Sequence, residues 1–279
     1  MSNTIYHGAI ALTLVLIIIY FMYENSPPVI AKGKIITHVY KGITHCGGKN
    51  VVHLLWTGGY DSTARLMQLL IIEKHPVQPI YVAAPNTDTK GIFAGRKNIV
   101  KEINTMKKIK KAVLARYPHT EPYFLPTVYI IKANYTDEIK QSLTSLHNKG
   151  YFERSHNQYG SFAAVSKYFN MTLEQGCERG EHTRLGKAVQ DYVVIDESKK
   201  GNDGQLLPNW QLSDIAPEDI KIFNQLRFPL IKMTKEDMLN QAKKYGYDDI
   251  MCMTTSCWYP SLLGKKCNDC DMCNERIFN

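Results

Sequence analysis

Several sequence features that would place a chain in a familiar class are missing from this chain of 279 residues. No Gly-Lys-Ser or Gly-Lys-Thr word occurs, which disfavours an ordinary P-loop motor or kinase. No Lys or Arg precedes the apolar run near the N-terminus, which argues against a cleaved signal peptide, because signal peptides normally begin with a basic region. No internal repeat or low-complexity tract is visible, so the sequence gives no sign of a repeat array.

The apolar run itself covers residues 5–23 and is interrupted only by His7. As a helix rising about 1.5 Å per residue it reaches roughly 28 Å, close to the thickness of a hydrocarbon core. We therefore predict a membrane anchor over residues 1–24, followed by a linker over 25–50. A signal peptide and a buried core helix are the alternatives.

The basic residues next to this run predict its orientation. Lys32, Lys34, Lys41 and Lys49 all follow the apolar run. By the positive-inside tendency, the long C-terminal part stays in the cytoplasm, as in a single-pass membrane protein. A reducing cytosol also suits the cysteines described below, because exported thiols tend to oxidise.

The most informative motif is Thr57-Gly58-Gly59-Tyr60-Asp61-Ser62-Thr63, which lies between an apolar run at 51–56 and a helical pattern. A strand that enters two glycines and then a helix surrounds one small space with backbone N–H groups and the positive end of a helix dipole. The glycines let the backbone approach an anion, the hydroxyl groups can donate hydrogen bonds, and Asp61 can hold Mg²⁺. The word is close to Ser-Gly-Gly-x-Asp-Ser, the PP-loop of ATP pyrophosphatases.

Two points qualify this interpretation. A plain β-turn into a helix also uses two glycines. The first position is Thr57 where the PP-loop usually has serine, and threonine keeps the hydroxyl while adding a methyl group. We expect the seven residues 57–63 to bind ATP and Mg²⁺, with Asp61 and Ser62 as the candidate catalytic residues.

The second strong pattern is Cys257, Cys267, Cys270 and Cys273, spaced Cys-x9-Cys-x2-Cys-x2-Cys. Two short turns can bring three thiolates around one point while a longer loop delivers the fourth, as in tetrahedral zinc sites. Disulfides are disfavoured, because the total of seven cysteines is odd and the loops between these four would be very short. A redox-active Cys-x-x-Cys is the other alternative. With four protein ligands, the zinc over 257–273 is expected to be structural.

Apolar strands alternate with helical patterns through the remaining chain. We predict strands at 51–56, 78–84 and 126–133, helices at 62–74 and 160–169, and a short strand and turn at 171–176. Residues 202–211 are typical of a loop, and a capping box opens a helix from Thr234 to Tyr245. This alternation predicts an α/β fold with a parallel sheet, whose ligands bind at the carboxyl ends of the strands.

The net charge of +8 is concentrated between residues 96 and 116. This segment has eight Lys or Arg residues against Glu102 alone, and an apolar stripe runs through it at helical spacing: Ile99, Ile103, Met106, Ile109 and Val113. Its basic face is interpreted as a solvated surface, a contact with anionic lipid, or a contact with nucleic acid. No interleaved aromatic residues support base stacking, which weakens the last interpretation.

The order of these motifs along the chain indicates a more specific resemblance. The PP-loop, the segment Phe228-Pro-Leu-Ile-Lys-Met-Thr-Lys-Glu-Asp-Met238 and the closing Thr255-Ser256-Cys257 with three further cysteines resemble 7-cyano-7-deazaguanine synthase, the QueC-like family. The resemblance spans residues 51–279. It implies a Rossmann-like domain of the adenine nucleotide alpha hydrolase type, and a reaction that adenylates 7-carboxy-7-deazaguanine, adds ammonia and dehydrates the amide to a nitrile.

Two groups of polar residues are candidates for contact with the substrate. Arg154, His156, Gln158 and Tyr159 form a polar cluster before a helix, and Glu174 follows that helix; surface loop polarity is the alternative. Two other functions stay open. One is a PP-loop enzyme that stops at the amide or modifies a tRNA base, and the other is a membrane-tethered scaffold that only binds ATP. A homodimer is also left open.

Overall fold

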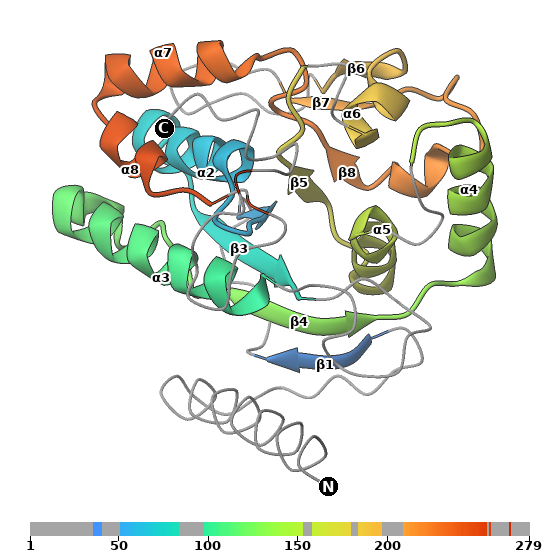
Figure 1. Cartoon of the computed structure of the whole chain (residues 1–279), viewed down its shortest axis with the longest axis horizontal. Helices are drawn as coiled ribbons and strands as arrows, with labels where there is room; N and C mark the ends of the chain where they lie inside the picture. The colour runs from blue at the N-terminus through green and yellow to red at the C-terminus, as the bar shows by residue number, and fades with distance from the viewer. Residues whose placement is uncertain are drawn as a thin grey trace, which may run out of the picture.

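The computed structural model describes residues 36–40, 51–83, 98–152, 158–179, 184–196, 209–255, 257 and 268. Strands and helices alternate along it, as predicted (Figure 1). The strands are β1 (Ile36–Tyr40), β2 (Val52–Leu55), β3 (Val77–Val82), β4 (Val128–Ala133), β5 (Leu173–Gln175), β6 (Val193–Ile195), β7 (Trp210–Leu212) and β8 (Leu226–Arg227). The α-helices are α2 (Tyr60–Met67), α3 (Ile99–Arg116), α4 (Asp137–Asn148), α5 (Gln158–Phe169), α6 (Arg184–Val189), α7 (Lys235–Tyr245) and α8 (Asp248–Cys252). A π-helical stretch, η1 (Gln68–Ile72), continues α2, and η2 (Pro118–Thr120) and η3 (Lys221–Phe223) are short 3-10 helices.

Six strands form one sheet in the order β1-β4-β3-β2-β5-β8. The pairings among the last five are parallel, which confirms the predicted parallel sheet. β1 pairs antiparallel with β4 at the edge. This strand lies inside the segment 25–50 that was predicted as a linker, so five residues of that segment belong to the sheet.

The path of the chain creates a switch point in the middle of the sheet. From β2 the chain moves outward through β3 to β4, and then it returns to place β5 on the opposite side of β2. The connections that leave β2 and β5 therefore diverge at the carboxyl ends of two neighbouring strands. In open α/β sheets, this is where ligands bind.

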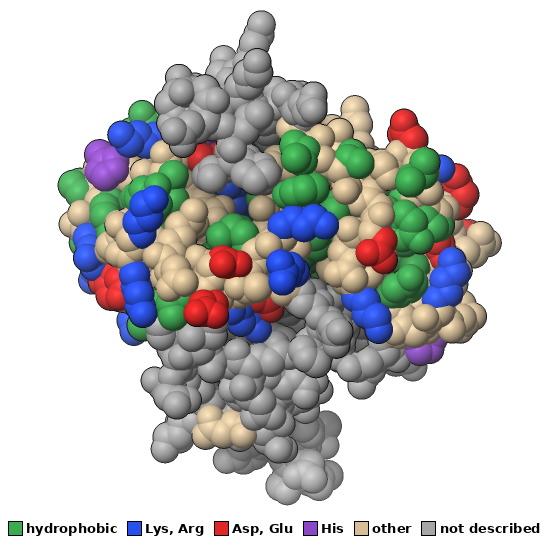
Figure 2. Space-filling model, turned by 90° about the horizontal axis from the view of Figure 1, so that it is seen from above, with side chains coloured by type: hydrophobic (Ala, Val, Ile, Leu, Met, Phe, Trp, Pro, Cys, Tyr) green, Lys and Arg blue, Asp and Glu red, His purple; other side chains and the backbone are tan. Residues whose placement is uncertain are grey.

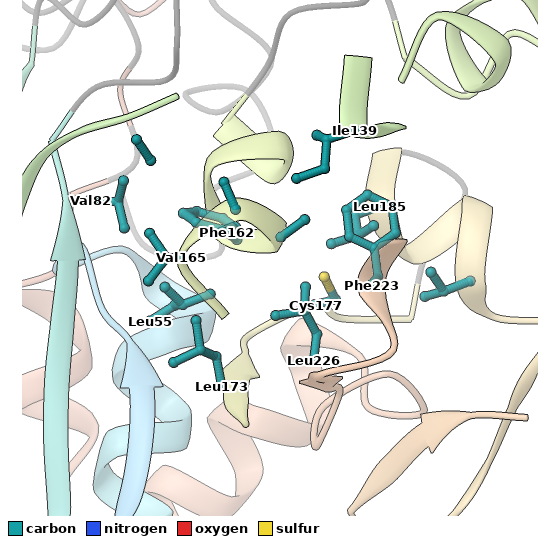
Figure 3. Close-up of a cluster of buried hydrophobic side chains, with 14 of the residues drawn as sticks. Leu55, Val82, Ile139, Phe162, Val165, Leu173, Cys177, Leu185, Phe223 and Leu226 are labelled. Atoms are coloured by element: carbon teal, nitrogen blue, oxygen red, sulfur yellow. The ribbon is translucent and has the colours of Figure 1, made fainter. Parts of the chain in front are cut away.

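Both faces of the sheet are buried, as expected of parallel strands covered by helices. All six residues of β3 are buried. In β2, Leu55 joins a core with α4 and α5, whereas Leu54 belongs, with the adjacent Trp56, to a second core with α2, α3, α7 and α8. Figure 3 shows the first of these cores, with Leu55, Val165 and Leu173 directed into one cluster.

The basic helix and the capped helix are confirmed with small shifts of their ends. α3 buries Ile99, Met106, Ile109 and Val113 of the predicted stripe, while Ile103 is only half-buried. At the start of α7, Thr234 and Asp237 form the reciprocal capping box, and Gly246 ends the helix in the left-handed conformation at φ +75°. These local patterns were recognisable because each depends on neighbouring residues only.

The charged side chains of α3 lie mainly on its outer face. Lys107, Lys108 and Lys111 are exposed, and Arg116 pairs with Asp249 of α8. Lys110 instead turns inward, and its Nζ lies 4.5 Å from the ring centroid of Phe124. On the face of the molecule that Figure 2 shows, Lys and Arg side chains lie among acidic and apolar ones. The basic outer face predicted for this helix is thus exposed to solvent.

The predicted loop over 202–211 was wrong at its end. Trp210 and Gln211 belong to β7, which pairs antiparallel with β6 as a separate two-stranded sheet. Pairing with a strand more than a dozen residues earlier overrides the local turn composition.

The predicted anchor over residues 1–24 lies outside the described residues. Among the helices that the structure does describe, none combines the length and hydropathy required for a membrane span.

Candidate active site at the carboxyl ends of β2 and β5

The Thr57–Thr63 loop leaves the carboxyl end of β2 and turns directly into α2, as the sequence predicts. Gly59 is the N-cap of α2 and provides no side-chain cap, so the positive end of the helix dipole carries no capping side chain. The loop lies at the switch point described above. The fold and the motif thus identify the same place in the sheet.

Gly58 takes the left-handed conformation that a side chain would strain, with φ +74°. A Cβ at this position would also lie 3.0 Å from Cγ2 of Thr105 and 3.3 Å from Cγ of Met106, both on α3. Glycine is therefore required here for two independent reasons. The inner face of α3 forms one wall of the loop.

Thr57 and Ser62 close the loop on itself. The N–H of Gly59 donates to Oγ1 of Thr57 at 3.4 Å, and Oγ of Ser62 donates to the carbonyl oxygen of Gly59 at 3.4 Å. Both bonds are long, and both hydroxyl groups can be redirected to a ligand at little cost. Threonine in place of serine at position 57 keeps the hydroxyl interaction.

Two loop residues face the protein interior instead of a ligand. Thr63 is fully buried, and its Oγ1 accepts a hydrogen bond from Nε1 of Trp56 at 3.1 Å. Tyr60 is buried, and its hydroxyl donates to the carbonyl oxygen of Lys235 at 3.3 Å. The ligand role that the sequence suggests for these two side chains does not fit this placement, because both anchor the loop to its supports.

Carboxylates set the electrostatics of the site. Burial raises the pKa of the Tyr60 hydroxyl, and the charges of Asp61 and Glu178 raise it further. Burial also raises the pKa of the Cys177 thiol, again with Asp61 contributing. Glu178 is buried and pairs with Nζ of Lys235 at 3.0 Å. Both Tyr60 and Cys177 are therefore neutral at physiological pH, and Asp61, Glu178 and Lys235 supply charge at this site.

A third glycine, Gly176, completes the site from β5. A Cβ there would lie 2.8 Å from the backbone nitrogen of Ser62 and 3.0 Å from the carbonyl carbon of Asp61. Such distances are not tolerated between backbone and side chain, so only glycine lets the exit of β5 pass the first turn of α2. From the sequence, Gly176 was predicted only as part of a turn, although a glycine directly after a short strand can mark a close backbone approach.

The segment before the cysteine cluster also reaches the loop. The N–H of Thr255 donates to the carbonyl oxygen of Gly58 at 3.0 Å. Cys257, two residues later, is buried. Gly58 and Thr255 are distant in the chain, and the fold places them in direct contact.

The predicted zinc ligands lie mostly outside the described residues, with Cys257 as the exception. Within the described part of the chain, no group of three His, Cys, Asp or Glu side chains could hold a metal. Cys177, Cys252 and Cys257, the described cysteines, are all thiols. The four-cysteine zinc site therefore stays a prediction.

The two groups suggested as substrate contacts differ in outcome. Arg154 and His156 lie outside the described residues. Tyr159 stacks on Phe152 with ring centroids 5.4 Å apart and packs against the core. Glu174 is almost fully buried, and Nε of Arg65 donates to its Oε2 at 2.7 Å. The Glu174 carboxylate also accepts from Asn209, so its described partners are protein groups and the predicted substrate contact finds no support in this placement.

Comparison with known families finds a match for one part of the chain. The sequence pattern of the family described as Queuosine biosynthesis protein QueC matches residues 212–278. No curated protein matches the sequence. The matched part contains α7, α8, Thr255 and all four predicted zinc ligands. It supports a QueC-like PP-loop enzyme of the ATP-using ligase type, related to queuosine biosynthesis.

Proposed function

We propose that this protein converts 7-carboxy-7-deazaguanine and ammonia to 7-cyano-7-deazaguanine, with ATP cleaved to AMP and pyrophosphate. One observation carries the proposal. The segment that matches the QueC pattern touches the PP-loop through the bond from Thr255 to Gly58. Two sequence signals that are distant in the chain are thus in contact, which supports the proposal that they contribute to one site.

The loop residues suit ATP because the start of α2, without a capping side chain, lies beside the hydroxyl groups of Thr57 and Ser62. The polyphosphate would lie against the first turn of α2, where the helix dipole and the backbone N–H groups favour negative charge. Ser62 and Thr57 would donate from their hydroxyl groups. Asp61 would hold Mg²⁺, which supplies charge neutralisation at the phosphates.

The reaction requires activation because a carboxylate is a poor electrophile. A carboxylate oxygen of the substrate attacks the α-phosphorus of ATP, and the bond to pyrophosphate breaks. Ammonia then attacks the acyl carbon, AMP leaves, and one proton is lost as the amide forms. A second adenylation, in which the amide oxygen attacks the α-phosphorus of another ATP, releases pyrophosphate. Departure of AMP with the oxygen and loss of both amide protons then give the nitrile. Donors fixed in advance around the loop would stabilise charge on the departing pyrophosphate.

The remaining expectations extend this proposal. We propose that Cys257, Cys267, Cys270 and Cys273 bind one structural Zn²⁺ in the segment next to the loop. Residues 5–23 would tether the protein to a membrane, with the catalytic domain in the cytoplasm. The small-molecule substrate is the main partner, and contact with nucleic acid has less support.

Mass spectrometry of the products tests the reaction. The purified chain, incubated with ATP, Mg²⁺, ammonia and 7-carboxy-7-deazaguanine, should yield the nitrile together with AMP and pyrophosphate. Accumulation of the amide without nitrile would support an enzyme that stops one step earlier. Absence of substrate turnover, with ATP still bound, would support a scaffold and contradict the proposal.

A further inference from the structure

A buried polar network links α2 to β5 directly behind the PP-loop. The guanidinium of Arg65 donates to both carboxylate oxygens of Glu174, from Nε to Oε2 at 2.7 Å and from the second terminal nitrogen to Oε1 at 3.2 Å. Nδ2 of Asn209 donates to the same Oε1 at 3.0 Å. Glu73 and Gln68 accept from the remaining terminal nitrogen of Arg65. Together these hydrogen bonds hold the guanidinium in one orientation.

The network is unusual in its burial. The side chains of Arg65 and Glu174 are only 4 % and 2 % exposed. Desolvation works to lower the pKa of Arg65, but the charges of Glu174 and Glu73 and the hydrogen bonds to them outweigh it and raise that pKa. The guanidinium thus stays ionised in the interior, where the adjacent carboxylates offset its desolvation.

A buried ion pair is a poor way to gain stability, because taking two charges out of water offsets most of their attraction. Apolar side chains of the same volume would hold this helix in the core at least as well. Leu66 and Met67 of α2 and Leu69 and Leu70 of η1 already do so with no exposure. What a two-pronged pair adds is register, since it forms in one relative position of its two elements. The network is therefore better explained by a need to fix the position of α2 relative to β5 than by a gain in the free energy of unfolding.

The residues that this register controls belong to the candidate site. Arg65 lies on α2 one turn after Asp61 and Ser62. Glu174 precedes Gly176 by two residues, and a Cβ on Gly176 would meet the nitrogen of Ser62 before any other atom. A shift of α2 along β5 would change that approach directly.

We propose that Arg65 and Glu174 are positioning residues, which hold the first turn of α2 at a fixed distance from the exit of β5 and so fix the place of the Ser62 N–H and hydroxyl that would contact a nucleotide's phosphates. This inference rests on the proposed function for its ligand. The Arg65–Glu174 ion pair itself, called the clamp below, depends only on α2 and β5. Neither side chain touches the nucleotide in this role.

The chain offers a matched control in a second arginine–carboxylate pair. Nε of Arg227 donates to Oδ2 of Asp196 at 3.0 Å, with side chains 17 % and 7 % exposed. This pair links β8 to the end of β6 and does not involve α2. Glu174→Gln and Asp196→Asn both remove a buried charge and keep the side-chain shape. Both should lower the urea midpoint of unfolding.

Two readouts separate positioning from stability. Hydrogen–deuterium exchange of the ligand-free chain should become at least about tenfold faster over residues 57–67 in Glu174→Gln and stay unchanged there in Asp196→Asn. Equilibrium titration with ATP should show affinity weakened by about tenfold or more in Glu174→Gln alone, in line with the steep cost of misplaced binding groups. If Glu174→Gln does not fold, Arg65→Lys tests the same point, because it keeps the charge and removes the two-pronged geometry.

The outcomes are distinguishable from those that test the function. Equal changes in both variants, in exchange over 57–67 and in ATP affinity, would overturn the positioning role. A wild-type chain that binds no ATP would overturn the proposed function, and the exchange measurement alone would then decide on the clamp. Faster exchange confined to Glu174→Gln or Arg65→Lys would support it in either case.

Discussion

Replacement of Gly176 with alanine would insert a methyl group 2.8 Å from the backbone nitrogen of Ser62 and 3.0 Å from Cα of the same residue. Ordinary contact at such a position begins at 3.4 Å, so the two backbone segments must separate by about 0.6 Å. The opposing atoms are main chain and cannot rotate away. The first turn of α2 or the exit of β5 must therefore move.

The expected effects follow from this displacement. Overpacking of this kind costs about 1–3 kcal/mol of unfolding free energy. Misplacement of binding groups by about 1 Å can cost about a hundredfold in rate, so we expect the smaller shift here to weaken ATP binding or raise the KM for ATP by about tenfold. Urea unfolding measures the first quantity, and calorimetric titration with ATP measures the second.

Gly246→Ala is the control for this variant. Gly246 has φ +75° at the end of α7, and a Cβ there would meet no atom within 4 Å. Alanine in the left-handed region costs about 1–2 kcal/mol, so this variant is destabilised to a similar extent outside the loop. We expect its ATP affinity to equal that of the wild type. An unchanged ATP affinity in Gly176→Ala would refute our assignment of the phosphate site.

Three further predictions concern other parts of the molecule. The backbone N–H and the hydroxyl of Thr234 hold the pKa of Asp237 below its usual range. The contribution of Asp237 to stability is therefore present at neutral pH and lost as the pH falls below about 4. The urea midpoints of the wild type and Asp237→Asn should differ at pH 7 and converge in acid, and a difference that does not change with pH would contradict this. Metal analysis should find one zinc per chain, lost in the double variant Cys267→Ser/Cys270→Ser and kept in the control Cys252→Ser, and zinc retention by the double variant would refute the ligand set. On α3, the double variant Lys108→Glu/Lys111→Glu should change the unfolding free energy by less than about 0.5 kcal/mol, because both side chains are exposed. Met106→Ala should cost about 2–5 kcal/mol, because that side chain is buried against Gly58. Similar losses in the two variants would contradict the observed faces of the helix.

Much of the sheet could be predicted from local sequence. β2, β3 and β4 are largely apolar runs, and a buried parallel strand requires little else. The apolar stripe of α3 and the capping box of α7 have periods and spacings that are recognisable directly. β1 was missed although its residues, Ile36–Tyr40, are mostly β-branched or aromatic, because it lies within a segment predicted as a linker. β7 has only three residues and is defined by its pairing with β6.

The site was predictable only as far as its loop. The Thr57–Thr63 word located the carboxyl end of β2, but it could not tell which side chains face inward, and Thr63 and Tyr60 bond to Trp56 and to the start of α7. Gly176 and Thr255 come from distant segments, and the proximity of Gly176 depends on the position of β5 in the sheet. Glu174 resembled a polar surface residue because nothing nearby in the sequence reveals Arg65 as its partner.

The central claim is that the loop after β2 directs attack at the α-phosphorus of ATP. Its most direct test is chromatography of the products from ATP labelled at the α-phosphate, with and without 7-carboxy-7-deazaguanine. We predict labelled AMP that appears only with the deazaguanine substrate and is lost in Asp61→Asn. Labelled ADP, or AMP whose formation ignores the substrate, would contradict the account.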